Sequence, residues 1–217
     1  LQGAFPFDVT QAGYQIKFIP RGTVSVVTIS SDELGAVAVG DKPAVQITSS
    51  REMDSQLPRR VSIKYFDNAR EYDISEQYAE RLNTDAVNLL DMQLPIVLTA
   101  TEAAGVAEKL LYLYWLERYS VSFTLPMAYA YLEPADVITI TSDNGTLELR
   151  IAQINYTSNG LVECQAKYNN NAVYVAAAIG EEGLSTGADI VFKSASLYVL
   201  LDIPCLQDQF NVPGFAA

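Results

Sequence analysis

Apolar and polar residues alternate along much of the chain, and this pattern predicts β-strands. Residues 14–18 place apolar side chains on one strand face and polar side chains on the other. A turn at 20–22 leads into a β-branched run over 23–29, so the pattern predicts a hairpin made of these two strands. A short turn or helix start over 31–34 and a strand over 44–48 complete this first section.

Three segments in the middle of the chain differ in their periodicity. Residues 60–66 alternate and predict an edge or half-buried strand. Residues 74–82 carry polar side chains spaced as on a helix surface, so we expect a helix there. Residues 87–98 are interrupted by Pro95, which cannot donate to a strand ladder, and they predict at most an edge strand or a bend.

The clearest predicted element is a helix over 100–118. Thr99 and Glu102 form a capping box at its start, and Arg118 stands where a basic residue complements the helix dipole. Helical spacing predicts a buried face made of Ala103, Ala107, Leu110 and Tyr114. An aspartate in place of Leu110 is therefore expected to unfold the domain, because it would bury an unpaired charge.

Beyond the helix the chain is predicted to form an antiparallel meander. A strand over 121–125 is followed, after Pro134, by runs over 137–141, 146–156 and 161–168. Asn-Gly pairs at 144–145 and 159–160 supply the positive φ that tight hairpin turns need. Shorter apolar runs lie at 173–179, 190–192 and 197–201. The predicted fold class is α+β, mainly antiparallel β of barrel or sandwich type, with one long amphipathic helix.

The predicted elements group into three parts. We expect an N-terminal β segment over 1–56, a main domain over 57–172, and C-terminal strands over 173–217 that lead into a following domain. The chain begins at Leu1 instead of Met. We therefore interpret it as a piece excised from a longer protein.

Composition and charge narrow the classes of partner. Hydrophobic residues make up 49% of the chain, enough for a substantial core. The formal net charge of −12 repels a phosphate backbone, so nucleic acid is not expected as a partner. No apolar run reaches the ~20 residues that span a bilayer. Core packing is the simpler interpretation, and partner contact the alternative, for Tyr112, Tyr114, Tyr129, Tyr131, Tyr156 and Tyr168.

Candidate chemistry is sparse. Residues 183–187 read G-x-S-x-G, but a serine hydrolase of that type needs an imidazole base and the chain has no histidine. The adjacent acids at 32–33 and 181–182 are typical of solvated turns, and Cys164 and Cys205 lack the spacing of a zinc site or a disulfide framework. We expect no catalytic, cofactor-binding or metal-binding residues, and no enzyme activity.

Three stretches of the chain carry a likeness to a known family when they are taken in order. They are 57–65 with Asp67, Ala69, Arg70 and Tyr72; 94–95 and the following helix with Trp115 and Arg118; and 125–126 before 132–137. Together they resemble the phage tail protein family that includes the hub of gene transfer agents. The likeness extends over about residues 5–206. One departure is Ala135, which stands where the family commonly has glycine, so a positive φ there would strain the turn.

The resemblance implies a hub or baseplate component at the end of a tail tube, built from hub-type barrel or sandwich domains. It also implies a homotrimer that contacts tail-tube, tail-tip and tape-measure proteins. Such a protein belongs to the virion tail and is assembled in the bacterial cytoplasm. Two alternatives stay open, a carbohydrate- or receptor-binding module of a tail tip and a cell-wall hydrolase with two carboxylates in a cleft.

Overall fold

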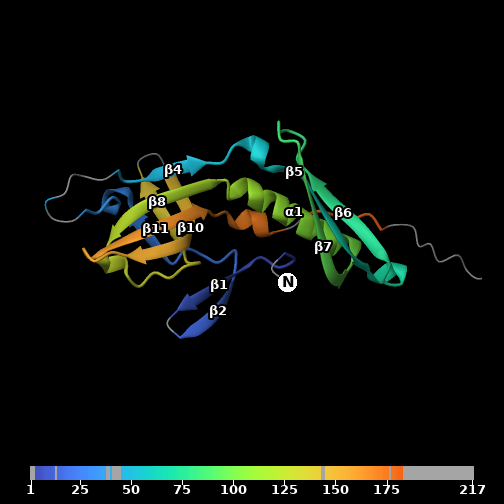
Figure 1. Ribbon diagram of the computed structural model, residues 1–217, viewed down its shortest axis with the longest axis horizontal. Helices are drawn as coiled ribbons and strands as arrows, with labels where there is room; N and C mark the ends of the chain where they lie inside the picture. Colours follow the sequence, from blue (N-terminus) through green and yellow to red (C-terminus); the bar gives the residue numbers. More distant parts are fainter. Residues whose placement is uncertain are drawn as a thin grey trace, which may run out of the picture. The chain divides into compact units, whose positions relative to one another are not determined.

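The computed structural model describes residues 3–12, 14–37, 40, 45–142, 145–175 and 177–182. Within these residues the strands form a two-stranded, a six-stranded and a three-stranded sheet, accompanied by one α-helix (Figure 1). The strands are mostly antiparallel and no closed barrel occurs in the described part of the chain. The predicted α+β class with one long helix is therefore confirmed.

The two-stranded sheet is an N-terminal hairpin of β1 (Phe7–Ala12) and β2 (Gln15–Pro20). The predicted strand in 14–18 is confirmed, but its predicted partner was wrong. Residues 23–26 form no strand, and β3 (Val27–Ser30) instead lies parallel to a distant strand of the six-stranded sheet. Alternation identifies a strand, whereas its partner depends on contacts far along the chain.

The six-stranded sheet has the order β3-β9-β10-β11-β8-β4. Its further strands are β4 (Thr48–Arg51), β8 (Tyr119–Pro126), β9 (Val137–Ser142), β10 (Gly145–Tyr156) and β11 (Leu161–Tyr168). These bounds confirm the predicted strand after the helix and the predicted meander. One face buries a core that includes Ile29, Val121, Phe123, Leu125, Ile140, Leu149, Ile151 and Val162. A register shift between Ile151 and Gln153 marks a β-bulge in β10.

The three-stranded sheet has β5 (Pro58–Asp67) at its centre, with β6 (Ile74–Glu80) antiparallel and β7 (Asn88–Leu98) parallel to it. The helix expected over 74–82 was wrong. Burial alternates with a period of two along β6, and Ser75 is buried between exposed neighbours. The strand predicted over 60–66 forms, but the edge position, one of its two predicted alternatives, was wrong because β5 is the central strand. Segment 87–98 is an edge strand, as Pro95 predicted.

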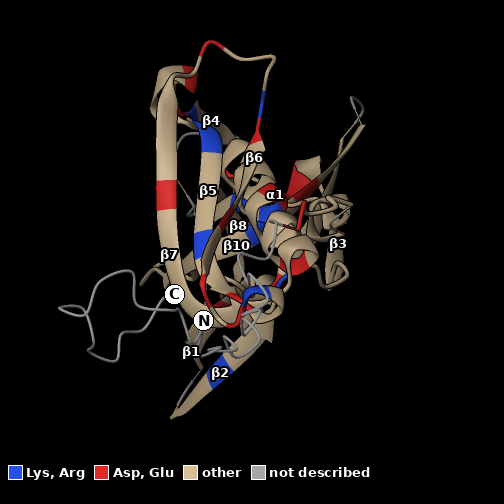
Figure 2. Ribbon diagram, turned by 90° about the vertical axis from the view of Figure 1, so that its right-hand side faces the viewer, with Lys and Arg blue, Asp and Glu red and all other residues tan. Residues whose placement is uncertain are grey.

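Basic and acidic residues face each other across the strands of this sheet. The basic residues lie on central β5, and acidic residues lie on both of its neighbours (Figure 2). Arg60 stands opposite Glu80, and Lys64 stands opposite Glu76. Opposite charges on facing positions stabilise this pairing, and like charges would destabilise it.

Helix α1 (Ala100–Leu116) packs on β5 and β6. The predicted capping box is confirmed, because the Thr99 N–H donates to Glu102 Oε2 at 2.9 Å and the Glu102 N–H donates to Thr99 Oγ1 at 3.3 Å. Ala103 and Ala107 are buried as predicted. In the later turns the buried residues include Leu111 and Trp115, whereas the predicted Leu110 is half-buried and Tyr114 is 42% exposed.

The C-terminal end of the helix differs from expectation. Arg118 lies beyond the last turn, and its guanidinium binds Asp54 at 3.2 Å. The Trp115 indole N–H donates to the Pro58 carbonyl at 2.9 Å, which ties the helix to the start of β5. Trp115 is therefore fixed by a hydrogen bond as well as by packing.

The remaining segments are short. The predicted turn over 31–34 is a 3-10 helix, η1 (Ser31–Glu33), and further 3-10 helices are η2 (Asp54–Gln56), η3 (Asn68–Arg70), η4 (Met127–Tyr129) and η5 (Asn171–Tyr174). The apolar run at 173–179 thus forms no strand where it is described. The runs at 190–192 and 197–201 lie outside the described residues. Among the described helices, none has the length and apolarity that a membrane crossing requires.

Because Leu111 lies in the core and Leu110 is half-buried, the substitution expected to unfold the protein is now at Leu111. Leu111 is 3% exposed in the cluster with Ala107 and Trp115, so Leu111→Asp should unfold the protein at room temperature. Tyr112→Asp is the matched control, because Tyr112 is 45% exposed, and its free energy of unfolding should change by less than about 1 kcal/mol. Circular dichroism melting checks both variants, and equal melting temperatures would show that the helix face is misassigned.

Candidate functional site

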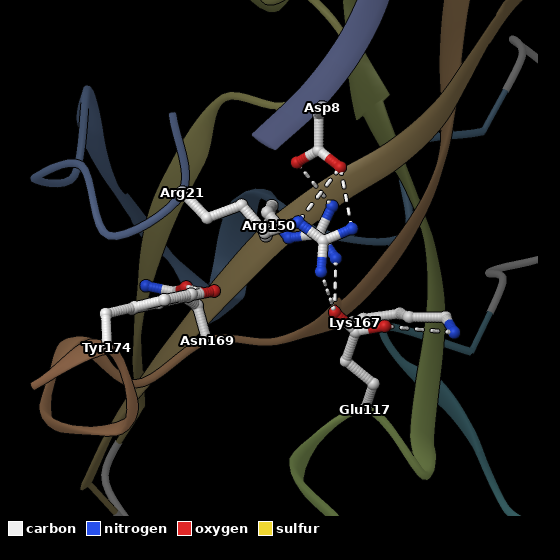
Figure 3. Close-up of polar contacts among 7 residues, drawn as sticks. All are labelled: Asp8, Arg21, Glu117, Arg150, Lys167, Asn169 and Tyr174. Atoms are coloured by element: carbon white, nitrogen blue, oxygen red, sulfur yellow. Dashed lines mark hydrogen bonds and ion pairs between the residues drawn. The ribbon is translucent and has the colours of Figure 1, made fainter. Parts of the chain in front are cut away.

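Two arginines and two carboxylates form a cluster beneath the N-terminal hairpin (Figure 3). We call Asp8, Arg21, Glu117 and Arg150 the arginine–carboxylate cluster. Arg21 contacts Asp8 Oδ1 at 2.8 Å and Glu117 Oε1 at 2.9 Å. Arg150 contacts Asp8 Oδ2 at 2.9 Å and Glu117 Oε1 at 2.7 Å. Each arginine therefore bridges both carboxylates.

The members of the cluster come from four parts of the fold. Asp8 lies on β1, Arg21 directly follows β2, Arg150 lies on β10, and Glu117 is the C-cap of α1. A carboxylate at a helix C-terminus is unfavourable in the field of the helix dipole. The two arginines, with Lys167 Nζ at 3.5 Å from Glu117 Oε2, supply the positive charge that offsets it.

Arg21 shows how burial and charge compete in the cluster. Burial alone would lower the pKa of Arg21, but the hydrogen bond that Arg21 donates to Asp8 and the negative charges of Glu117 and Asp8 raise its pKa above the ordinary value. Its neighbour Gly22 has φ +86°, and a Cβ there would lie 3.0 Å from the Tyr174 ring. Tyr174 thus packs against the chain as it leaves the hairpin.

A cleft of about 450 Å³ opens beside the cluster, between β1 and the bulged part of β10. Its lining includes Thr10, which is 8% exposed and whose hydroxyl has no hydrogen-bond partner within the protein. A second cleft of about 550 Å³ is lined by Lys17, Glu133 and Tyr156 among others. Lys17 Nζ and Glu133 Oε2 form an ion pair of 2.7 Å at this second cleft.

Two carboxylates in one cleft invite comparison with a glycosidase. Asp8 and Glu117 both line the first cleft, yet all four of their oxygens already contact a cation. A general acid needs a protonated carboxyl and a nucleophile needs a free oxygen. Neither condition suits this arrangement, whose chemistry is that of a structural ion-pair network.

Sequence reasoning did not find this cluster. Asp8 and Arg150 are 142 residues apart, and no local pattern links them. The acidic residues that the sequence did single out lie apart from it. Asp32 and Glu33 are exposed in η1, with Glu33 accepting a hydrogen bond from the Tyr129 hydroxyl, and residues 181–182 are also exposed.

The cysteines and the G-x-S-x-G segment were the other candidates that the sequence offered. Cys164 is buried and free, and burial raises the pKa of its thiol to about 11. Cys205 and the G-x-S-x-G at 183–187 lie outside the described residues. In the described ranges, no group of three or more His, Cys, Asp or Glu side chains is placed to hold a metal ion.

Of the six tyrosines interpreted first as core residues, Tyr129 and Tyr168 pack against the core and the other four are exposed. Tyr112, Tyr114, Tyr131 and Tyr156 are 42–59% exposed, and Tyr129 and Tyr168 are half-buried. The core interpretation was therefore wrong for the four exposed rings. Among the exposed rings, Tyr156 is held in place because its hydroxyl donates to the Ala130 carbonyl at 3.1 Å. The half-buried Tyr168 stacks on Tyr119 with ring centroids 4.8 Å apart. Fixed, exposed aromatic rings are available for partner contacts.

Removing one arginine tests the cluster. Arg150→Met should lower the free energy of unfolding by about 2–4 kcal/mol, because it leaves Asp8 and Glu117 with unmatched negative charge in a partly buried place. Backbone amides of β1 and β2 should also exchange hydrogen faster. Lys17→Met is the control on the same hairpin, and its exposed ion pair should account for less than about 1 kcal/mol. Urea unfolding measures both variants. If both lose the same free energy of unfolding, the cluster contributes no more to stability than an exposed ion pair does.

Ala135 tests the strain expected at the position where glycine is common. Its φ of +78° is in the left-handed region, and its N–H donates to the Ile151 carbonyl at 2.8 Å. Ala135→Gly should raise the free energy of unfolding by about 0.5–1 kcal/mol, since glycine adopts this φ without strain. Ala130→Gly is the control, because Ala130 has φ −65° and should lose stability instead. Urea unfolding gives the free energy of unfolding of both variants, and a loss in both would contradict strain at Ala135.

The fold of this chain is similar to that of solved structures, and its sequence matches a family model. A chain of the native gene transfer agent (GTA) virion has a similar structure, with a TM-score of 0.72 and 21% identity over 83% of this chain and 40% of that chain. At this identity the similarity shows the fold alone. This chain spans well under half of the length of that neighbour.

Two further solved structures are more distant. They are a tail protein from Neisseria meningitidis MC58 (TM-score 0.47, 10% identity, 78% of this chain and 53% of that one) and the 43 kDa tail protein of prophage MuSo2 from Shewanella oneidensis (TM-score 0.48, 12% identity, 78% and 52%). No curated protein sequence matches significantly. The family model described as "Putative phage tail protein" matches residues 1–154. Because that match covers more than half of the chain, the chain belongs to this phage tail protein family.

Proposed function

We propose that this chain is a structural, non-catalytic segment of the hub or baseplate at the end of a phage-type tail. The observation that carries the proposal is the family match over residues 1–154, joined to a fold similar to that of a chain in an assembled virion. The segment acts through protein–protein contacts within a homotrimer and with tail-tube, tail-tip and tape-measure proteins. It is assembled in the bacterial cytoplasm and resides in the virion tail.

Open strand edges support an assembly function. In the described part of the chain, β6 and β7 each pair with β5 alone, so each leaves a row of backbone donors and acceptors facing outward. Exposed edges of this kind promote pairing with another chain, and a closed assembly covers them. The fixed and exposed tyrosines add aromatic contact area of the kind enriched in interfaces.

The alternatives have weaker support. An enzyme would need free carboxylates, whereas Asp8 and Glu117 are held by the two arginines and Lys167. A carbohydrate-binding module would need a concave group of aromatic rings, and the larger cleft has Tyr156 as the single aromatic residue among its described lining. A structural function in the tail requires neither feature.

The proposal is tested on the full-length protein and on purified tail particles. Light scattering of the full-length protein should give the mass of a trimer, and immunogold labelling should mark the end of the tail in electron micrographs. An antibody against the major tail-tube protein is the positional control, because it should label the whole tube. A clean monomer at micromolar concentration, with no label on the particles, would overturn the hub proposal.

A further inference from the structure

The N-terminal hairpin has its polar face turned inward and its apolar face turned outward. Residues that face each other across β1 and β2 share one side of the hairpin. On the inner side, Asp8 binds Arg150, and Thr10 stands opposite Lys17, which binds Glu133. This arrangement reverses the usual rule for a surface strand, in which the apolar face packs on the protein's own core.

The outer side is apolar and exposed. Val9 stands opposite Phe18 and is 50% exposed, and Phe18 is 69% exposed although its ring contacts Phe7 at a centroid distance of 5.8 Å. Ile16 is 68% exposed, and Tyr14, in the turn that joins the two strands, is fully exposed. These side chains together present roughly 500 Å² of surface, given that one large aromatic residue accounts for about 150–250 Å². A patch of this size on a soluble domain usually marks an interaction site.

The hairpin cannot bury this face by turning over. Asp8 and Arg21 flank it in the arginine–carboxylate cluster, and Lys17 holds the other strand through its 2.7 Å ion pair with Glu133. Turning the hairpin would break all of these ion pairs and place apolar side chains against Arg150. The apolar face is therefore held outward in a preorganised position, which lowers the entropy lost on binding.

The charge of the chain limits where two copies can meet. The formal net charge is −12, so two copies repel each other wherever acidic surfaces meet. The outer side of the hairpin consists of Phe7, Val9, Gln11, Ile16, Phe18 and Pro20, none of which is ionisable. Along β2 the one charged side chain is Lys17, and its ion pair with Glu133 places it on the inner side. This uncharged face is a place where two acidic copies can approach closely.

We infer that the outer face of the β1–β2 hairpin packs against an adjoining copy of this chain. The inference rests on the proposed assembly function and names a contact that carries it. The exposed area supplies more than half of the ~800 Å² that each partner contributes to a standard specific interface. In addition, neither β1 nor β2 pairs with a third strand in the described part of the chain, so the hairpin edges are available to the same neighbour.

Self-association of the full chain tests the inference by sedimentation equilibrium at micromolar concentration. The wild type should form a species of two or three copies, and Phe18→Asp should weaken association at least about tenfold by placing a charge in the contact. Met53→Asp is the matched control, because Met53 is 72% exposed and lies outside the hairpin and outside every strand. It should associate nearly as the wild type does. Melting temperatures should stay close to wild type in both variants, which separates loss of contact from unfolding.

A photo-cross-linking residue at position 16 identifies the occupant directly in the full-length protein. A cross-link to a second copy supports the inference. Cross-links exclusively to a different tail protein, a wild type that stays monomeric, or Phe18→Asp associating as tightly as wild type would each overturn it. These failures differ from failure of the proposed function, because a monomeric chain that is still present in purified tails leaves the tail function standing.

Discussion

Two arginines shared between two carboxylates determine how the hairpin, the end of the helix and the six-stranded sheet meet. Arg21 and Arg150 each contact both Asp8 and Glu117. Because each charge has two partners, removing any one leaves the other three unbalanced in a partly buried place. Ion pairs of this kind add little net stability compared with well-packed apolar groups, but they are directional. They fix the orientation of the hairpin, which apolar contact alone would leave free to slide.

The same region joins the two larger sheets. Glu117 and Arg118 are the two residues between α1, which packs on the three-stranded sheet, and β8 in the six-stranded sheet. Glu117 enters the arginine–carboxylate cluster, and Arg118 binds Asp54 on the segment between β4 and β5. The Arg118 carbonyl also accepts from the Glu52 N–H at 3.0 Å. Both chain connections between these sheets are therefore linked to each other.

Local patterns predicted most helices and strands, but they did not predict which strands pair or which face of the helix is buried. The capping box at Thr99 and the Asn-Gly turn at 159–160 are complete within a few residues, and both elements form where the sequence predicts them. The helix face was misjudged because Leu110 and Leu111 are adjacent, and one residue corresponds to about 100° of rotation. The strand at 74–80 was mistaken for a helix because seven residues span only two helical turns, too few to separate the two periods.

The hairpin shows why the inward face of a strand is not decided by alternation alone. Alternation at 14–18 predicts two faces, and the usual expectation places Phe18 inside. Burying that face would gain about 1.5–3 kcal/mol for a large apolar side chain. It would also remove Asp8 from Arg150, and an unmatched buried charge costs about 3–5 kcal/mol. Turning the hairpin would also break the Arg21–Asp8 and Lys17–Glu133 ion pairs, so partners far away in the sequence hold the apolar face of the hairpin outward.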